Sequence, residues 1–116
     1  MRYVTETQEW IELQGDEGTF GLTKAAQLEL GEIVYVGTVQ VGDQLQAGQE
    51  MIVLESLKAA VDLLAPAACV VLEVNPQVMA SPTLLQQDPE GIAWLLKVRF
   101  KEPVPLSSWR SLALSS

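Results

Sequence analysis

One lysine stands apart from every other basic residue in the sequence. Between residues 25 and 96, Lys58 is the sole cation among nine acidic residues. The other basic residues lie nearer the two ends of the chain: Arg2, Lys24, Lys97, Arg99, Lys101 and Arg110. An exposed lysine most often only solubilises a turn, but an accessible amine is also what an acylating enzyme needs. Lys58 is therefore a candidate modification site, with a solubilising role as the alternative.

The residues around Lys58 predict an exposed hairpin turn. Apolar stretches at 52–54 and 61–64 flank the segment Glu55-Ser56-Leu57-Lys58-Ala59-Ala60. Strand-like runs on either side of a short polar and small segment indicate that the chain reverses there. The small side chains of Ala59 and Ala60 leave the approach to the amine open. We expect Lys58 at the tip of a rigid hairpin.

The composition excludes most other chemistry. The chain has no histidine, and its one cysteine is Cys69, which excludes a Cys/His zinc site, a histidine-based triad and an intramolecular disulfide. We expect Cys69 to be an inert packing residue, with exchange against a nearby disulfide as the alternative. The formal net charge of −8 would repel nucleic acid and anionic membranes. With no apolar membrane span and no apolar signal core, the sequence predicts a cytoplasmic protein without either partner.

Short apolar stretches dominate the chain and predict a mainly β fold. Turn residues, mostly glycine, proline, aspartate and asparagine, separate them, and Asn75-Pro76 is interpreted as one of these turns. Many short strands with regular turns are typical of a sandwich or barrel. The stretches of strand length are 10–13, 19–22, 33–36, 51–54, 61–64, 70–74 and 94–100. A length of 116 residues suits one compact domain, so we expect a single domain over residues 1–116.

Three short helices are also predicted. Thr23 can cap a helix that runs to Leu30, and Gly31 can take the left-handed closing conformation. A second helix is expected around 81–85, where Pro82 suits a first helical turn. Residues 101–116 are expected to form a C-terminal tail, with a helix at 107–114.

The segment Glu55-Ser56-Leu57-Lys58-Ala59 resembles the lipoyl-attachment signature of the H protein of the glycine cleavage system, with Leu57 where that family usually has valine. A biotin carrier has a similar architecture, but its acceptor lysine normally lies between two methionines. The resemblance extends, in order and spacing, from about Tyr3 to about Phe100. Segments that carry it include Glu9-Trp10, Gly21-Leu22-Thr23, Leu30-Gly31-Glu32-Ile33-Val34, Val41-Gly42-Asp43, Ala65-Pro66, Asp88-Pro89 and Trp94-Leu95.

This resemblance implies a flattened lipoyl-type β barrel, a barrel-sandwich hybrid of two small sheets, with lipoate joined covalently to Lys58. It implies a non-catalytic carrier that takes an aminomethyl group from the pyridoxal-phosphate (PLP) glycine decarboxylase to the tetrahydrofolate-dependent aminomethyltransferase. It also implies electron transfer to dihydrolipoyl dehydrogenase and modification by lipoylating enzymes. Because an acidic carrier must visit several enzymes, we expect a monomer. The alternative is a divergent lipoylated protein that acts as a lipoyl donor, a reservoir or a redox interaction module.

The same resemblance implies functional roles for three acidic residues. Glu55 would help the lipoylating enzyme select Lys58, and Glu9 and Asp62 would line a cleft that parks the arm and binds its ammonium group. The alternative for each is an ordinary solvated surface charge. No metal ligands and no catalytic residues are expected.

The sequence departs from the family pattern at three places. Gln8 stands where the family usually has histidine, and Ala68-Cys69 replaces a Ser-Gly pair. Ile92-Ala93 replaces a more polar pair that contains glycine. None of these departures touches the lipoyl motif, so they concern the cleft and the partner-facing surfaces.

Overall fold

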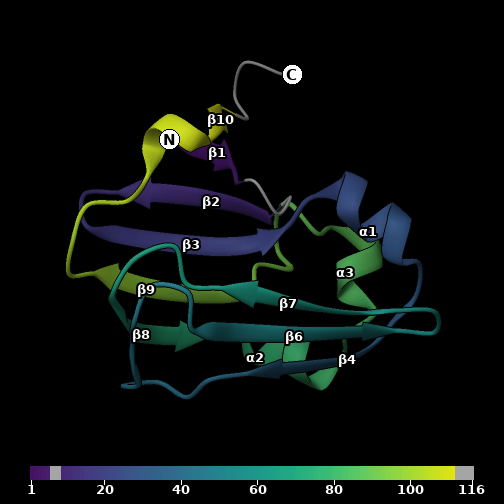
Figure 1. Cartoon of the computed structure of the whole chain (residues 1–116). Helices are drawn as coiled ribbons and strands as arrows, with labels where there is room; N and C mark the ends of the chain where they lie inside the picture. Colours follow the sequence, from purple (N-terminus) through teal and green to yellow (C-terminus); the bar gives the residue numbers. More distant parts are fainter. Residues whose placement is uncertain (6–8, 112–116) are drawn as a thin grey trace.

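The computed structural model describes residues 1–5 and 9–111, and within them the fold is mainly β (Figure 1). Ten strands form two antiparallel sheets in this described part of the chain. The first sheet has the strand order β10-β1-β2-β3-β9-β8-β5 and the second the order β4-β6-β7. The first sheet consists of β1 (Arg2–Val4), β2 (Glu9–Gln14), β3 (Glu17–Leu22), β5 (Gln44–Leu45), β8 (Cys69–Val74), β9 (Leu96–Phe100) and β10 (Arg110–Ser111). The second consists of β4 (Ile33–Thr38), β6 (Glu50–Ser56) and β7 (Ala60–Leu64).

The strand predictions are confirmed in position and nearly in length. All seven apolar stretches form strands, although the strand in the stretch 94–100, β9, begins at Leu96 and not at Trp94. Three strands were missed, β1, β5 and β10, and each is only two or three residues long. Such short strands carry almost no periodicity in the sequence, because alternation needs at least four residues to show.

Two of the three predicted helices are present. Helix α1 (Lys24–Leu30) begins as expected, because Thr23 Oγ1 accepts a hydrogen bond of 3.1 Å from the Ala26 amide, and Gly31 closes it at φ +79°. Helix α3 (Leu84–Gln87) begins two residues after Pro82. Pro82 lies in the turn before it, where its carbonyl accepts from the Leu85 amide at 3.0 Å.

Helix α2 (Pro76–Ala80) was not expected, because Asn75-Pro76 was interpreted as a turn. The Asn75 side chain caps this helix by accepting from the Gln77 amide at 3.1 Å, and Pro76 occupies the first helical turn, where its missing N–H is no loss. The side-chain Nδ2 of Asn75 also donates to the carbonyls of Ile92 and Trp94. These contacts attach the helix start to the segment before β9.

The predicted helix at 107–114 is wrong in the part that the structure describes. The 3-10 helix η1 (Leu106–Ser108) is followed by β10, which pairs with β1 in the register Tyr3↔Ser111. The edge of β1 supplies backbone hydrogen-bond partners to β10, and this pairing is more favourable than a weakly amphipathic helix. The rings of Tyr3 and Trp109 also pack together, with their centroids 6.1 Å apart. Residues 112–114 lie outside the described residues.

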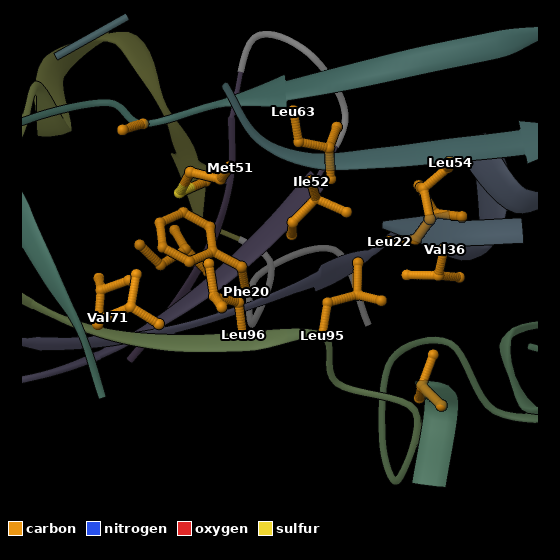
Figure 2. Packing of buried hydrophobic residues seen from close by; sticks show 14 of the residues in the cluster. Phe20, Leu22, Val36, Met51, Ile52, Leu54, Leu63, Val71, Leu95 and Leu96 are labelled. Carbon is orange, nitrogen blue, oxygen red and sulfur yellow. The ribbon is translucent and has the colours of Figure 1, made fainter. Parts of the chain in front are cut away.

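The hydrophobic core lies between the two sheets. Figure 2 shows Phe20 and Leu96 of the first sheet opposite Ile52 and Leu63 of the second, and all four side chains are fully buried. One buried cluster includes residues from both sheets and from all three α-helices. No helix in the described ranges is long and apolar enough to cross a membrane.

Candidate functional site

Lys58 lies at the tip of the hairpin that joins β6 to β7, as predicted. The two strands pair in the register Leu54↔Val61 and Glu55↔Ala60, so Ser56 and Ala59 close the turn. Figure 1 shows this hairpin extending past α1 at the edge of the molecule. Lys58 and Ala59 are exposed. The amine is therefore placed where a modifying enzyme can reach it.

Ser56 fixes the conformation of this turn. Its amide donates to the Ala59 carbonyl at 2.8 Å, and its Oγ accepts from the amides of Lys58 and Ala59 at 3.3 and 3.1 Å. A serine hydroxyl that bonds the backbone two and three residues ahead is a recurrent turn device. The hairpin tip is thus a hydrogen-bonded support for Lys58 and not a loose loop.

A hollow of about 280 Å³ lies directly beside the hairpin. It is bounded by the end of β3, one face of α1 and the chain from Ala59 through Leu63 of β7. Its lining residues are Leu22, Ala26, Glu29, Leu30, Ala59, Val61 and Leu63. Because Ala59 lines the hollow and follows Lys58 in the chain, the backbone that carries the lysine lies at the rim of this hollow. The lining is apolar apart from Glu29.

Glu9 is buried in the first sheet, with only 3% of its surface exposed. Its backbone partner across β2 and β3 is Leu22, which lines the hollow. Side chains of directly opposed strand residues lie on the same face of a sheet, so the Glu9 carboxylate is on the face that carries Leu22. The interpretation of Glu9 as an ordinary surface acid is therefore wrong.

Asp62 is placed differently from Glu9. It is exposed on β7, between Val61 and Leu63, which both line the hollow. Side chains alternate between the two faces of a strand, so Asp62 lies on the opposite face of β7 from those two residues. The structure thus places the two acids on different sides of β7.

Glu55 is exposed three residues before Lys58, on the outer face of the second sheet. It lies opposite Tyr35 of β4 and Ala60 of β7, at the end of a shallow hollow of about 410 Å³ that Gly37 and Val53 also line. Among the described residues Glu55 has no ion-pair partner. Its carboxylate is available to another protein.

Sequence reasoning missed the contribution of α1 to this site. Ala26, Glu29 and Leu30 are spaced i, i+3 and i+4, so they share one face of the helix, and this face lines the hollow. The spacing shows that the three residues belong together. It does not show that the hairpin packs against them.

The family departures that the structure describes lie away from the hairpin. Cys69 is fully buried at the start of β8, and burial raises the pKa of its thiol, while the Lys101 ammonium lowers it to a smaller extent. The thiol is thus a protonated packing group at neutral pH. Ala93 is also fully buried, whereas Ile92 is 58% exposed. Gln8 lies outside the described residues.

Comparison with known proteins places these features in a family. The family model described as "Glycine cleavage H-protein" matches residues 1–112. The glycine cleavage system H protein of Dinoroseobacter shibae is 41% identical over 105 residues, which cover 90% of this chain and 86% of the relative. That of Rubrobacter xylanophilus is 43% identical over 104 residues, 90% and 82% of the two chains. A crystal structure of a glycine cleavage system H protein from Mycobacterium marinum matches with a TM-score of 0.85 at 31% identity, over 97% of this chain and 91% of the other. The chain belongs to the glycine cleavage H-protein family.

Proposed function

We propose that this protein is the lipoyl-bearing carrier of the glycine cleavage system, with lipoate joined as an amide to Lys58 Nζ. One observation carries the proposal: the isolated cation of a long acidic segment occupies the hydrogen-bonded tip of an exposed hairpin, beside an apolar hollow. The residues present fit the cofactor. The amine is exposed for attachment, and the hollow offers apolar surface to an aliphatic arm.

The chain's own residues hold, present and shield the arm. When bound, lipoate supplies a cyclic disulfide that opens to accept the aminomethyl group and is later re-formed by oxidation of the dithiol. Ser56 keeps the attachment point fixed, and the hollow excludes water from the arm when the arm lies in it. Glu55 is the contact by which the lipoylating enzyme selects Lys58. Because a tethered arm reaches an active site without a new encounter, tethering raises its effective concentration.

The proposed partners follow from this carrier role. They are the PLP-dependent glycine decarboxylase, the aminomethyltransferase, dihydrolipoyl dehydrogenase and the lipoylating enzymes, all in the cytoplasm. We propose that the chain catalyses nothing itself and acts as one monomeric domain over residues 1–116. The core shared by both sheets supports a single domain, and a net charge of −8 opposes self-association.

The donor or reservoir alternative has less support. It rests on the departures from the family pattern, and two of the residues concerned, Cys69 and Ala93, are fully buried and so do not alter a docking surface, whereas Ile92 is exposed. Glycine–bicarbonate exchange, measured with lipoylated protein and a glycine decarboxylase, decides between the two functions. We expect exchange, with a higher apparent KM for the carrier than in a Gln8→His variant and a similar maximal rate, which is the pattern of weakened docking.

Absence of exchange would contradict the glycine-cleavage role under two conditions. If exchange is absent while lipoate is confirmed on Lys58 and the same decarboxylase works with another H protein, the glycine-cleavage role is wrong. The chain would then be a lipoyl donor or reservoir.

We further propose that Glu9 and Asp62 prolong the life of the loaded arm, each by binding its ammonium in a different position of the arm, because the two acids lie on different sides of β7. Losing one ammonium partner costs about 1 kcal/mol, so ammonia release without folate should accelerate about fivefold in Glu9→Gln or Asp62→Asn. Glu50→Gln is the control, because Glu50 is an exposed acid at the opposite end of β6 from the hairpin. Unchanged release in both variants would leave apolar shielding as the only protection.

A further inference from the structure

We propose that Tyr35 of strand β4 is a docking residue for the lipoylating enzyme, and that its ring and the Glu55 carboxylate together bind one arginine side chain of that enzyme. The inference rests on the proposed function, because it needs Lys58 to be the residue that is modified. It extends the recognition site from a single acid to a groove on the outer face of the second sheet. The partner surface that fits this groove is a basic protein segment.

Tyr35 and Glu55 lie side by side on the outer face of the second sheet. They are directly opposed across β4 and β6, so their side chains are on the same face. Tyr35 is 51% exposed, and its ring lies over Gly37, where an added Cβ would be 2.8 Å from Tyr35 Oη. The missing side chain of Gly37 thus lets the ring rest against the sheet with one face toward solvent. Both Tyr35 and Glu55 line the groove of about 410 Å³.

The charge of this groove is purely negative. Its lining residues are uncharged apart from two acids, Glu50 and Glu55, and neither acid has an ion-pair partner among the described residues. A guanidinium binds the face of an aromatic ring by a cation–π interaction, and its N–H groups donate to a carboxylate in a fixed fork. An exposed tyrosine ring beside a free carboxylate therefore fits arginine better than the compact, strongly hydrated ammonium of lysine.

A second copy of this chain is a poor occupant of the groove. Three basic residues on the outer face of the first sheet, Arg2, Lys97 and Arg99, each form an ion pair with an acid of their own sheet or its adjoining turn. They would have to leave those acids to reach the groove of another copy. Two chains that each carry a net charge of −8 also repel one another. The occupant is therefore a different, basic protein.

The closeness of the groove to Lys58 selects the lipoylating enzyme among the proposed partners. Strand β6 carries Glu55 and leads directly into the hairpin turn at Ser56. In the modification step the neutral Nζ attacks the carbonyl carbon of an acyl adenylate, the amide bond forms, AMP leaves and one proton is released. That step needs the two reacting atoms about 3–3.5 Å apart, so the enzyme must hold the hairpin itself. The later partners meet the far end of a flexible arm and have no such need.

The test is steady-state lipoylation of the full-length unmodified protein by a lipoate ligase, with lipoate and ATP, followed by intact mass. Wild type is compared with Tyr35→Leu, Tyr35→Phe, Glu55→Gln and the double variant Tyr35→Leu/Glu55→Gln. Glu73→Gln is the control for charge, because Glu73 is an exposed acid on the first sheet. The Tm of Tyr35→Leu should stay close to that of wild type, because the ring is half exposed and lies outside the core.

We expect the apparent KM for the carrier to rise about threefold or more in Tyr35→Leu with an unchanged kcat, which is the pattern of lost docking. Tyr35→Phe, which keeps the ring, and Glu73→Gln should behave like wild type. The rise in the double variant should be smaller than the product of the two single rises, because both residues bind one arginine.

An equal KM in wild type and Tyr35→Leu would overturn the inference, and so would independent effects in the double variant. A change confined to glycine–bicarbonate exchange would assign the groove to the decarboxylase and would also overturn it. If wild type gains no lipoyl mass, the proposed function fails first. If wild type is lipoylated and Tyr35→Leu is unaffected, only this inference fails.

Discussion

Lys58→Arg is expected to leave the protein folded and to abolish lipoyl attachment completely. The side chain is exposed at the hairpin tip, and the turn is held by Ser56 and backbone groups, so the substitution removes no packing. Arginine keeps the positive charge, but its guanidinium does not form the required amide. Intact mass after co-expression with a lipoate ligase measures the effect. Wild type should gain one lipoyl amide, and Lys58→Arg should gain none.

Two further lysine variants serve as matched controls for this experiment. Lys24→Arg and Lys97→Arg should be lipoylated like wild type, because Lys24 begins a helix and Lys97 pairs with Glu73 at 3.5 Å within the first sheet. Neither lies on a hairpin tip. Lipoate on Lys58→Arg, or a label that maps to Lys24 or Lys97, would show that the attachment site is wrong. Glycine–bicarbonate exchange should be lost only in the Lys58→Arg protein.

Gly21→Ala is expected to destabilise the fold by about 3 kcal/mol, at the upper end of the usual cost of overpacking. Gly21 lies directly opposite Trp10 across β2 and β3, and a Cβ at this position would overlap the indole ring. The ring cannot easily move away. It is 1% exposed, its Nε1 donates to the Pro89 carbonyl at 2.9 Å, and the Arg2 guanidinium lies 4.1 Å from its centroid.

Urea unfolding of wild type and Gly21→Ala measures this loss. Gly15→Ala is the control, because Gly15 has a positive φ of 62° but a Cβ added there would meet no atom within 4 Å. It should cost about 1 kcal/mol, from backbone strain alone. A loss at Gly21 no larger than the loss at Gly15 would contradict the close packing of Trp10. Since Glu9 precedes Trp10, Gly21→Ala should also disturb the site.

Pairing partners that are far apart in the sequence account for the strands that were missed. Gln44 of β5 pairs with Val70, and Arg110 of β10 pairs with Val4. A two-residue strand exists only because a neighbouring edge supplies its hydrogen bonds, and no local pattern reports that edge. The same reason explains the wrong prediction of a helix at 107–114. The helical pattern there is weak, and residues 110–111 pair with β1 as a strand. Helix α2 was not predicted because the pair Asn75-Pro76 is equally compatible with a turn and with a capped helix start.

The mainly β fold, the capped helix α1 and the exposed hairpin that carries Lys58 can all be predicted from the amino-acid sequence. These features depend on local patterns: apolar runs of strand length, Thr23 before a helix, and a small polar segment between two strands. The side chains that surround the hairpin, in contrast, depend on how the elements pack in three dimensions. Leu22, Ala26 and Val61 meet in one hollow because the two sheets pack face to face and α1 covers the gap beside β7. The burial of Glu9, the outward position of Asp62 and the place of Glu29 in the hollow all follow from that packing, which brings together residues far apart in the chain.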